Sequence, residues 1–345
     1  MGNNILQYII LFVIVLIRYF LIAGIAFVVF YKLFSKKFSK NKIQGSFPKK
    51  EDYIREILQS TQITFIIAGV GLLMLKTPLK AYTKVYENLS DYSLWWIPIS
   101  VVLAMVVQDT YFYWMHRTVH HPIFFKQIHL LHHKSNNPSP WTSYSFHLFE
   151  GILEALIVPI IFILIPMHPI AIILFVFIGF TINVYGHLGY EIAPKWLRHS
   201  FLFEMMNTST HHNMHHAKFK ENYGLYFRFW DRLMKTEHPD YVKIYDRIQK
   251  RRFGIYMHKS FTLKSTFLFI MAIGIACMMI SFKVSKEIKG KWKDNNQGGV
   301  LRLYEKVGLY FDLFIEADNP EEKNENRKFG AVFLMKNGNK KRSSE

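Results

Sequence analysis

Residues 116–133 read HRTVHHPIFFKQIHLLHH, and residues 211–216 read HHNMHH. These two stretches hold most of the 16 histidines in the chain. Within each stretch the histidines recur three or four residues apart, a spacing that places side chains on one face of a helix. Each cluster therefore directs two or three imidazole rings toward one point, and the rest of the fold has to bring these points together.

Long apolar segments surround the histidine clusters and predict helices that cross a membrane. These segments are Ile5–Tyr31, Ile57–Leu75, Trp95–Met115, Phe146–Asn183 and Thr262–Phe282. The fourth is interrupted at Pro166, His168 and Pro169, so it predicts a helical hairpin rather than one helix. We expect an integral membrane protein whose fold is mainly α, a helical transmembrane bundle.

The positive charge of the chain predicts its orientation. Half of the residues are hydrophobic, the formal net charge is +18 and the pI is about 9.7. Seven lysines follow the first apolar segment between residues 32 and 50, and such a loop lies on the cytoplasmic side. The N-terminus is then outside, and the histidine clusters fall where the chain returns to the cytoplasm. Basic residues beside apolar runs fit contact with anionic lipid headgroups, and no nucleic-acid motif is present.

Four regions follow from this pattern. Residues 1–93 hold the first membrane helices and the basic loop, residues 94–261 a domain with the histidine clusters, residues 262–284 a last membrane helix, and residues 285–345 a β-rich extracytoplasmic tail. Three tail segments have strand-like composition, and they are Gly299–Glu305, Leu309–Glu316 and Lys328–Met335. The tail resembles the start of a lipocalin-like periplasmic domain, and a partly disordered tail fits its composition equally well.

The histidines predict a metal site with two ions. Neutral imidazole binds iron, zinc, copper and nickel, and eight or more such ligands exceed what one ion can use. Cys277 is the only cysteine, so disulfides within the chain and thiolate metal sites are excluded. The zinc-protease pattern H-E-x-x-H is absent, and no serine or cysteine lies in a nucleophile-elbow context.

Five stretches of the sequence resemble the fatty acid hydroxylase superfamily, in particular its sterol desaturase-like branch. They are Asp109–His121, His129–His133, Gly186–Glu191, His211–His216 and Asn222–Thr236. The resemblance covers roughly Leu94 to Pro239. It implies a di-iron site capped on the cytoplasmic side, above a substrate tunnel in the membrane.

The resemblance also implies which residues bind the metals. The ligands carried over are His116, His120, His129, His132, His133, His187, His212, His215 and His216, with His211 added as their neighbour. The roles of His121, His147 and His199 stay open. Leu148 stands where the family usually has proline after His147, and Asn213 stands where many members have aspartate.

Carboxylates are expected to support the metal ligands, because a metal-bound histidine usually donates its second ring N–H to an acceptor. Asp109 lies two helical turns before His116 on the same face, and a carboxylate buried at a membrane edge is costly without a partner. We count Asp109, Glu191 and Asp231 as catalytic candidates, and Glu150 as a weaker one.

The resulting hypothesis is a membrane-bound di-iron oxygenase that hydroxylates or desaturates a lipid with O2. Zinc can replace the two irons in a purified sample. The aromatic residues Phe112, Trp114 and Tyr144 are candidates to line the substrate path. Fatty acyl chains, sterol-like rings, ether lipids and carotenoids all remain possible substrates.

The sequence contains no electron-transfer motif of its own, so a separate ferredoxin, cytochrome b5 or reductase is expected. A bacterial inner membrane fits the composition, and an endoplasmic reticulum membrane is the alternative. Two other functions compete with the oxygenase. One is a metal-ion transporter, and the other is a non-catalytic lipid-binding protein with a structural metal.

Overall fold

The computed structural model describes residues 2–254 and four short tail segments, 300–302, 312–314, 332–334 and 340–342. The chain divides into two compact units. One unit comprises Met1–Glu87 and Ile97–Phe269, and the other comprises Asn88–Trp96 and Ile270–Glu345. The first unit carries both histidine-rich stretches, so the description centres on it.

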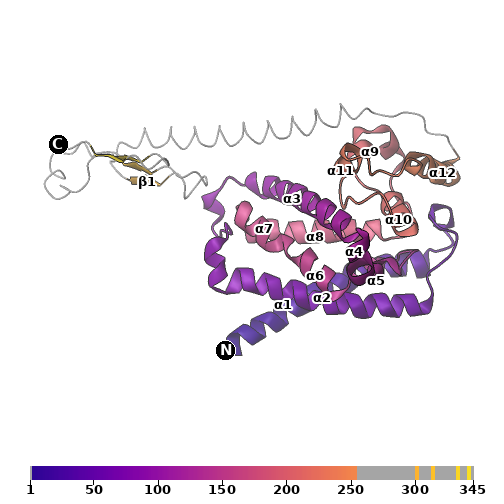
Figure 1. The fold of residues 1–345 in the computed structure, drawn as a ribbon, viewed down its shortest axis with the longest axis horizontal. Helices are drawn as coiled ribbons and strands as arrows, with labels where there is room; N and C mark the ends of the chain where they lie inside the picture. The colour runs from indigo at the N-terminus through magenta and orange to yellow at the C-terminus, as the bar shows by residue number, and fades with distance from the viewer. Residues whose placement is uncertain (1, 255–299, 303–311, 315–331, 335–339, 343–345) are drawn as a thin grey trace. The chain divides into compact units, whose positions relative to one another are not determined.

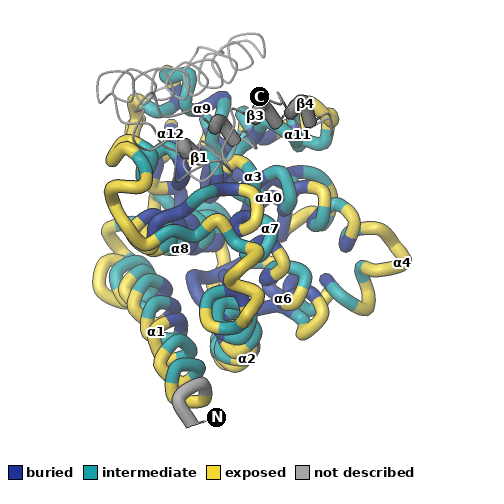
Figure 2. Tube along the Cα trace, turned by 90° about the vertical axis from the view of Figure 1, so that its left-hand side faces the viewer, coloured by how far each residue is buried: buried dark blue, intermediate teal, exposed yellow. Residues whose placement is uncertain are grey.

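Four helices of the described chain are long and apolar enough to cross a membrane. They are α1 (Gly2–Phe27), which continues as a π-helical turn (Val28–Leu33), α2 (Lys50–Lys76), α3 (Trp96–Val119) and α8 (Pro169–Gly186). Large apolar side chains such as Ile5, Leu58 and Ile173 are more than 60% exposed on these helices. Figure 2 shows α1 with an exposed outer face and a buried inner one. Side chains of this kind need a lipid environment, and the protein is an integral membrane protein.

The predicted hairpin is confirmed. Two short helices, α6 (Leu148–Ala155) and α7 (Ile157–Leu164), lead up to the turn, and α8 returns from it (Figure 1). His168 caps the start of α8 through its Nδ1 atom, which accepts the amide N–H of Ile170, and Pro169 occupies the first helical position. The break therefore falls where the sequence placed it.

The helix α2 begins seven residues before its predicted start. Asp52 accepts the backbone N–H of Lys49 and so holds the first turn, which extends the helix into the polar segment. This polar start brings Arg55 and Glu56 onto a helix that was predicted only for its apolar part.

The bundle has two distinct ends. At one end, a β-bridge joins Lys42 to Tyr190, so the loop between α1 and α2 meets the chain that follows α8. At the other end, a bridge joins Val85 to Met167, so the loop after α2 meets the hairpin turn. The basic loop and the C-terminal end of α8 therefore lie on the same side, as the predicted topology requires.

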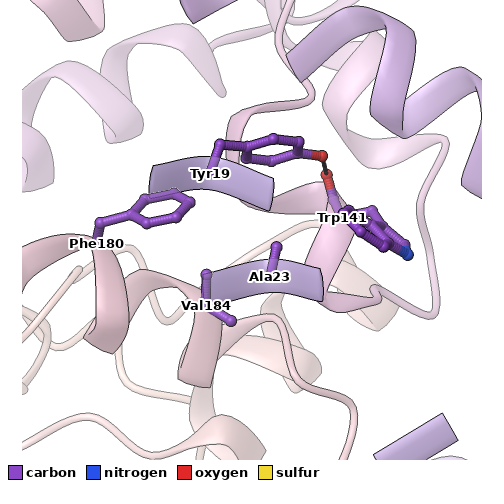
Figure 3. Close-up of a cluster of buried hydrophobic side chains, with 5 residues drawn as sticks. All are labelled: Tyr19, Ala23, Trp141, Phe180 and Val184. Atoms are coloured by element: carbon purple, nitrogen blue, oxygen red, sulfur yellow. Dashed lines mark hydrogen bonds between the residues drawn. The ribbon is translucent and has the colours of Figure 1, made fainter. Parts of the chain in front are cut away.

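A buried cluster holds α1 against the middle of the bundle (Figure 3). Tyr19 and Ala23 of α1 pack with Trp141, Phe180 and Val184. The Tyr19 hydroxyl donates a hydrogen bond to the backbone carbonyl of Trp141 over 2.9 Å. The first membrane helix is thus part of the core that surrounds the histidines.

Shorter elements carry the histidines at the end that holds the basic loop. Before the hairpin these are α4 (Pro122–Phe124), a π-helical turn (Phe125–His129), α5 (Leu130–His133) and a 3-10 turn (Pro140–Tyr144). After it come a 3-10 turn (Lys195–His199), α9 (Phe201–Met205), α10 (Ser209–Lys218), α11 (Phe229–Leu233) and α12 (Tyr241–Phe253). Figure 1 shows α9 to α12 gathered together beyond the end of α8.

The second unit contains four short antiparallel strands in sequential order. They are β1 (Val300–Arg302), β2 (Asp312–Phe314), β3 (Val332–Leu334) and β4 (Lys340–Arg342). Leu301 pairs with Leu313, and Leu313 pairs with Phe333. The helix predicted at Thr262–Phe282 lies outside the described residues. The position of the tail relative to the membrane stays a prediction.

Candidate metal centre

Nine histidines converge in two groups. The first group contains His116, His120, His129, His133 and His215, and the second contains His132, His187, His212 and His216. Within each group, one ring nitrogen from every member lies within 4.8 Å of those of the others. These nine residues are the ligands that the family resemblance implied.

The two groups share their supporting helices. α5 provides His132 to one group and His133 to the other, and α10 does the same with His216 and His215. The two groups are therefore adjacent, because consecutive residues of one helical turn belong to different groups.

The ring nitrogens approach each other as ligands around an ion do. In the first group, the His116 and His129 Nε2 atoms are 3.1 Å apart, and the His133 and His215 Nε2 atoms are also 3.1 Å apart. In the second group, the Nε2 atoms of His212 and His187 are 3.0 Å apart. Metal–nitrogen bonds of about 2.1 Å would separate neighbouring ligands by roughly 3.0 Å in an octahedron and 3.4 Å in a tetrahedron.

Hydrogen bonds at Nδ1 fix the protonation of these rings. The Nδ1 atoms of five ligands lie 2.7–3.2 Å from backbone carbonyls: His116 from Tyr223, His132 from Ser145, His187 from Asn183, His215 from Glu221 and His216 from Ser135. A carbonyl can only accept, so each Nδ1 must carry the proton and each Nε2 presents a lone pair. Lone pairs facing each other at 3 Å repel, and a cation between them removes that repulsion. The donor set therefore fits a pair of metal ions.

Burial keeps the rings neutral. It lowers the pKa of His187 and of His215 to about 4, and that of His120 to about 2, because the surrounding protein cannot solvate the imidazolium ion. Neutral imidazole is the form that binds metals. The ligands are therefore deprotonated at neutral pH before any ion arrives.

Glu150 supports one ligand directly. Its Oε1 atom lies 2.6 Å from Nδ1 of His129, and both side chains are almost completely buried. A carboxylate that accepts this proton orients the ring and makes Nε2 a stronger ligand. The sequence ranked Glu150 below Asp109, because α6 comes next to the π-helical turn that ends at His129 only in the folded chain.

The three catalytic candidates Asp109, Asp231 and Glu191 accept hydrogen bonds from backbone N–H groups and do not contact the converging histidines. Asp109 accepts the N–H groups of Leu225, Tyr226 and Phe227 through Oδ1, at 2.7–3.2 Å. Asp231 and Glu191 act similarly on other segments. Asp231 accepts the N–H groups of Tyr223 and Gly224, and Glu191 accepts that of Thr210 at the start of α10. The structure brings none of the three into either histidine group.

Comparison with known proteins agrees with this geometry. The family model named fatty acid hydroxylase matches residues 101–236, which include all nine histidines. Residues 101–236 are therefore similar in sequence to the fatty acid hydroxylase family. The match falls within the span of roughly Leu94 to Pro239 that the sequence motifs had indicated.

Curated proteins similar to this chain carry the names of sterol-modifying enzymes. A lathosterol oxidase of Mus musculus is 36% identical over 181 residues, which cover 50% of this chain and 56% of the relative. The lathosterol oxidase of Homo sapiens is 31% identical, with 53% and 60% covered. A Delta(7)-sterol 5(6)-desaturase of Gibberella zeae is also 31% identical, with 57% and 55% covered. The chain thus spans little more than half the length of these relatives, and no solved structure matches it.

The remaining histidines with predicted or open roles lie elsewhere. His211 is fully buried but belongs to neither group, and its Nε2 atom is 3.9 Å from carboxylate oxygens of Asp231 and Glu237. His121 and His147 cap the starts of α4 and α6. His199 is exposed. His211 is thus the one predicted ligand that the structure keeps apart from the others.

Two of the three aromatic candidates line a cavity, and the third does not. Phe112 and Tyr144 line a cavity between the helices. Trp114 is 42% exposed, and its ring packs against that of Trp230 at 5.6 Å. Position 114 faces away because it lies two residues after Phe112 on α3, about half a turn round the helix.

Sequence reasoning missed Glu56. It is completely buried in α2 and accepts hydrogen bonds from the Ser135 and Ser139 hydroxyls. The Ser135 carbonyl in turn faces Nδ1 of His216. An acidic residue at the start of an apolar helix was a usable signal, since such a residue needs a partner.

Proposed function

We propose that this protein is a membrane-bound oxidoreductase that uses two irons and O2 to hydroxylate or desaturate a lipid. The observation that carries the proposal is the pair of buried groups of neutral histidines, whose lone pairs converge within a fatty acid hydroxylase segment. A structural zinc site needs only four ligands and would leave the first group with one too many.

The protein would contribute to the reaction by holding the imidazole rings of these histidines in fixed positions. Bound iron would supply the activation of O2 toward an unreactive C–H bond. Six of the nine proposed ligands hold their Nε2 atoms in place through partners on Nδ1, so little reorganisation accompanies binding at those rings. The cavity near them, lined mostly by apolar side chains, lies among the membrane helices, so a lipid would reach it without leaving the bilayer.

A sterol-like lipid is the substrate that the relatives favour. The named reactions of those relatives are sterol oxidation and desaturation. The cavity that Phe112 and Tyr144 line lies among membrane helices and suits an apolar ring system. Hydroxylation and desaturation use the same kind of centre, so both stay within the proposal.

A separate electron-donor protein is part of the proposal. The basic surface near the first histidine group would favour a donor with an acidic surface. The Phe125 ring lies 5.3 Å from His120, and the Phe219 ring lies 5.1 Å from His133. Exposed lysines flank these residues in the sequence, and they are Lys126, Lys134, Lys218 and Lys220. Opposite charge increases the rate at which a ferredoxin, cytochrome b5 or reductase would dock.

In the proposed orientation the histidines lie on the cytoplasmic side of the membrane, because they are at the same end of the helix bundle as the lysine-rich loop. The organisation into residues 1–93, 94–261, 262–284 and 285–345 follows, with the β-strand tail outside. A bacterial inner membrane is proposed, with the endoplasmic reticulum as alternative.

Metal content and lipid products test the function together. Protein expressed with added iron and purified in detergent should contain about two irons per chain. His215→Ala and His212→Ala, one from each group, should retain one iron or fewer, while the exposed His199→Ala control retains two. Extracts of cells that express the wild type should gain oxidised or desaturated sterol-like lipids that both ligand variants lack. Two tightly bound metals without any lipid product would favour a lipid-binding protein, and wild-type protein without transition metal would favour a transporter.

A further inference from the structure

One face of the membrane helix α2 holds the chain segment 135–145, which lies between α5 and α6 in the sequence. Glu56, Gln59 and Ser60 share this face, because residues three and four positions apart on a helix are neighbours. Glu56 and Ser60 are completely buried. Polar groups buried among membrane helices are costly unless they are paired, so the partners of this face indicate its role.

Glu56 ties together two residues of the segment. Its Oε1 atom accepts the Ser135 hydroxyl over 2.7 Å, and its Oε2 atom accepts the Ser139 hydroxyl over 2.6 Å. Arg55 donates to the Ser135 Oγ atom over 3.0 Å, so this hydroxyl is held from both sides. Both oxygens of the buried carboxylate are thus used to hold the first half of the segment.

The next turn of α2 holds the second half. The Oε1 atom of Gln59 accepts the Ser145 hydroxyl over 2.6 Å. The Ser60 hydroxyl donates to the Trp141 carbonyl over 3.0 Å. Two adjacent turns of one helix therefore fix the segment at both of its ends and in its middle.

The same segment supplies the carbonyls that face two ligands of the second histidine group. The Ser135 carbonyl lies 3.0 Å from Nδ1 of His216, and the Ser145 carbonyl lies 3.2 Å from Nδ1 of His132. The residues whose hydroxyls are held by Glu56 and Gln59 are thus the residues whose carbonyls orient these two rings.

A third ligand of this group is connected to the segment through α8. The Asn183 amide donates to the Ser143 carbonyl over 3.1 Å, and the Asn183 carbonyl lies 2.9 Å from Nδ1 of His187. Three of the four rings of the second group are therefore oriented by the segment itself or by a residue bonded to it.

The first histidine group takes its Nδ1 partners from other parts of the chain. These partners are the carbonyl of Tyr223 for His116, the carbonyl of Glu221 for His215 and the carboxylate of Glu150 for His129. Asp231 holds the loop that contains the two carbonyls, since it accepts the N–H groups of Tyr223 and Gly224. None of these partners belongs to residues 135–145.

We propose that Glu56 and Gln59 are positioning residues for the second metal ion and have no such role for the first. By holding the serine segment they hold the carbonyls that keep protons on Nδ1 of His132 and His216, and so direct the Nε2 lone pairs at the ion. Asp231 has the corresponding role for the first ion. The proposal rests on the proposed function, because it requires two bound ions.

Metal titration of proteins with a single site tests this assignment. The full-length protein, purified in detergent without metal, carries His215→Ala, so that Fe2+ reports on the second group, or His212→Ala, so that it reports on the first. Adding Glu56→Ala should weaken Fe2+ binding about tenfold in the His215→Ala protein, the lower end of the effect of disturbing the hydrogen-bond partner of a ligand. It should leave the affinity of the His212→Ala protein unchanged, while Asp231→Ala should give the opposite pattern.

Conservative variants separate positioning from a general loss of structure. Glu56→Gln keeps an oxygen that accepts from one serine, and its NH2 group can donate to the other, so it should restore most of the affinity. Gln59→Leu leaves the Ser145 hydroxyl without its acceptor and should weaken the second site alone. Co2+ in the second site should show shifted absorption bands in Glu56→Ala, because the ligand geometry changes. The exposed Glu51→Ala, on the first turn of α2, should match its parent in both backgrounds.

An unchanged second site in Glu56→Ala and Gln59→Leu, or equal weakening of both sites, would overturn the positioning role. If Glu56→Ala does not fold, Glu56→Gln and Gln59→Leu still decide between these outcomes. The proposed function fails separately. A protein that shows this pattern of affinities but oxidises no lipid keeps the positioning role and loses the oxygenase assignment, while lipid oxidation with a second site indifferent to Glu56 and Gln59 does the opposite.

Discussion

His129 differs from the ligands whose Nδ1 protons are shared with backbone carbonyls, because its partner is the carboxylate of Glu150 at 2.6 Å. A charged acceptor forms a stronger hydrogen bond than a neutral one and increases electron density at the opposite nitrogen. The first histidine group therefore contains one ligand whose basicity depends on a single residue outside the group.

Glu150→Ala should weaken metal binding about 10- to 100-fold, because His129 loses the partner that fixes its tautomer. Glu150→Gln should cost less, since the amide oxygen can still accept. Titration of iron against a competing chelator measures the change, and the exposed Glu51→Ala serves as the matched control. Unchanged affinity in a folded Glu150→Ala protein would contradict this role.

The close packing of helix α6 against helix α2 determines where Glu150 lies. Gly151 lies against Ile63, and a Cβ atom at position 151 would come within 2.4 Å of the Ile63 Cδ1 atom. The glycine thus lets α6 approach α2 closely enough for the preceding residue to reach His129.

Gly151→Ala should destabilise the protein by about 1–3 kcal/mol, the usual cost of an added methyl group in a packed core. Thermal unfolding in detergent should show a lower midpoint than for Gly45→Ala, where the new Cβ has nothing within 4 Å. Ile63→Val removes the Cδ1 atom and should restore much of the loss in the double variant. Failure of this rescue would mean that another contact sets the distance between α2 and α6.

The sequence alone predicted the membrane helices of the described residues and the nine histidines that converge, since each depends on a local pattern. The length of the apolar segments predicted the hairpin. The spacing of the histidines, together with the family motifs, predicted all nine rings that converge. The acids were harder to place. Asp109 was predicted to face the histidines, but its partners are 116–118 residues away in sequence, where no helical periodicity reaches. His211 shares its cluster with His212, His215 and His216 but joins neither group, and its Nε2 atom lies 3.9 Å from carboxylate oxygens of Asp231 and Glu237.

Acid should destabilise the metal-free protein as a whole. The pKa of His187 and of His215 is about 4 in the folded chain, below the usual value near 6.5. Their contribution to stability is therefore present above about pH 6.5 and is lost as the pH falls toward 4. Asp231 opposes this trend, because burial raises its pKa to about 7.

Unfolding of the metal-free protein between pH 8 and pH 4 measures this dependence. The midpoint should fall steeply below about pH 6.5, and the variant His187→Ala should show a shallower slope. A flat profile across this range would show that the rings are solvated or already paired with ions.

The sharing of α5 and α10 between the histidine groups would couple the loading of the two proposed metal ions. An ion held by His133 and His215 fixes the backbone of the turns that also present His132 and His216. The second ion then meets ligands whose ordering entropy has already been lost, so its uptake is cooperative. A chain with a single ion would then be a minor species during assembly.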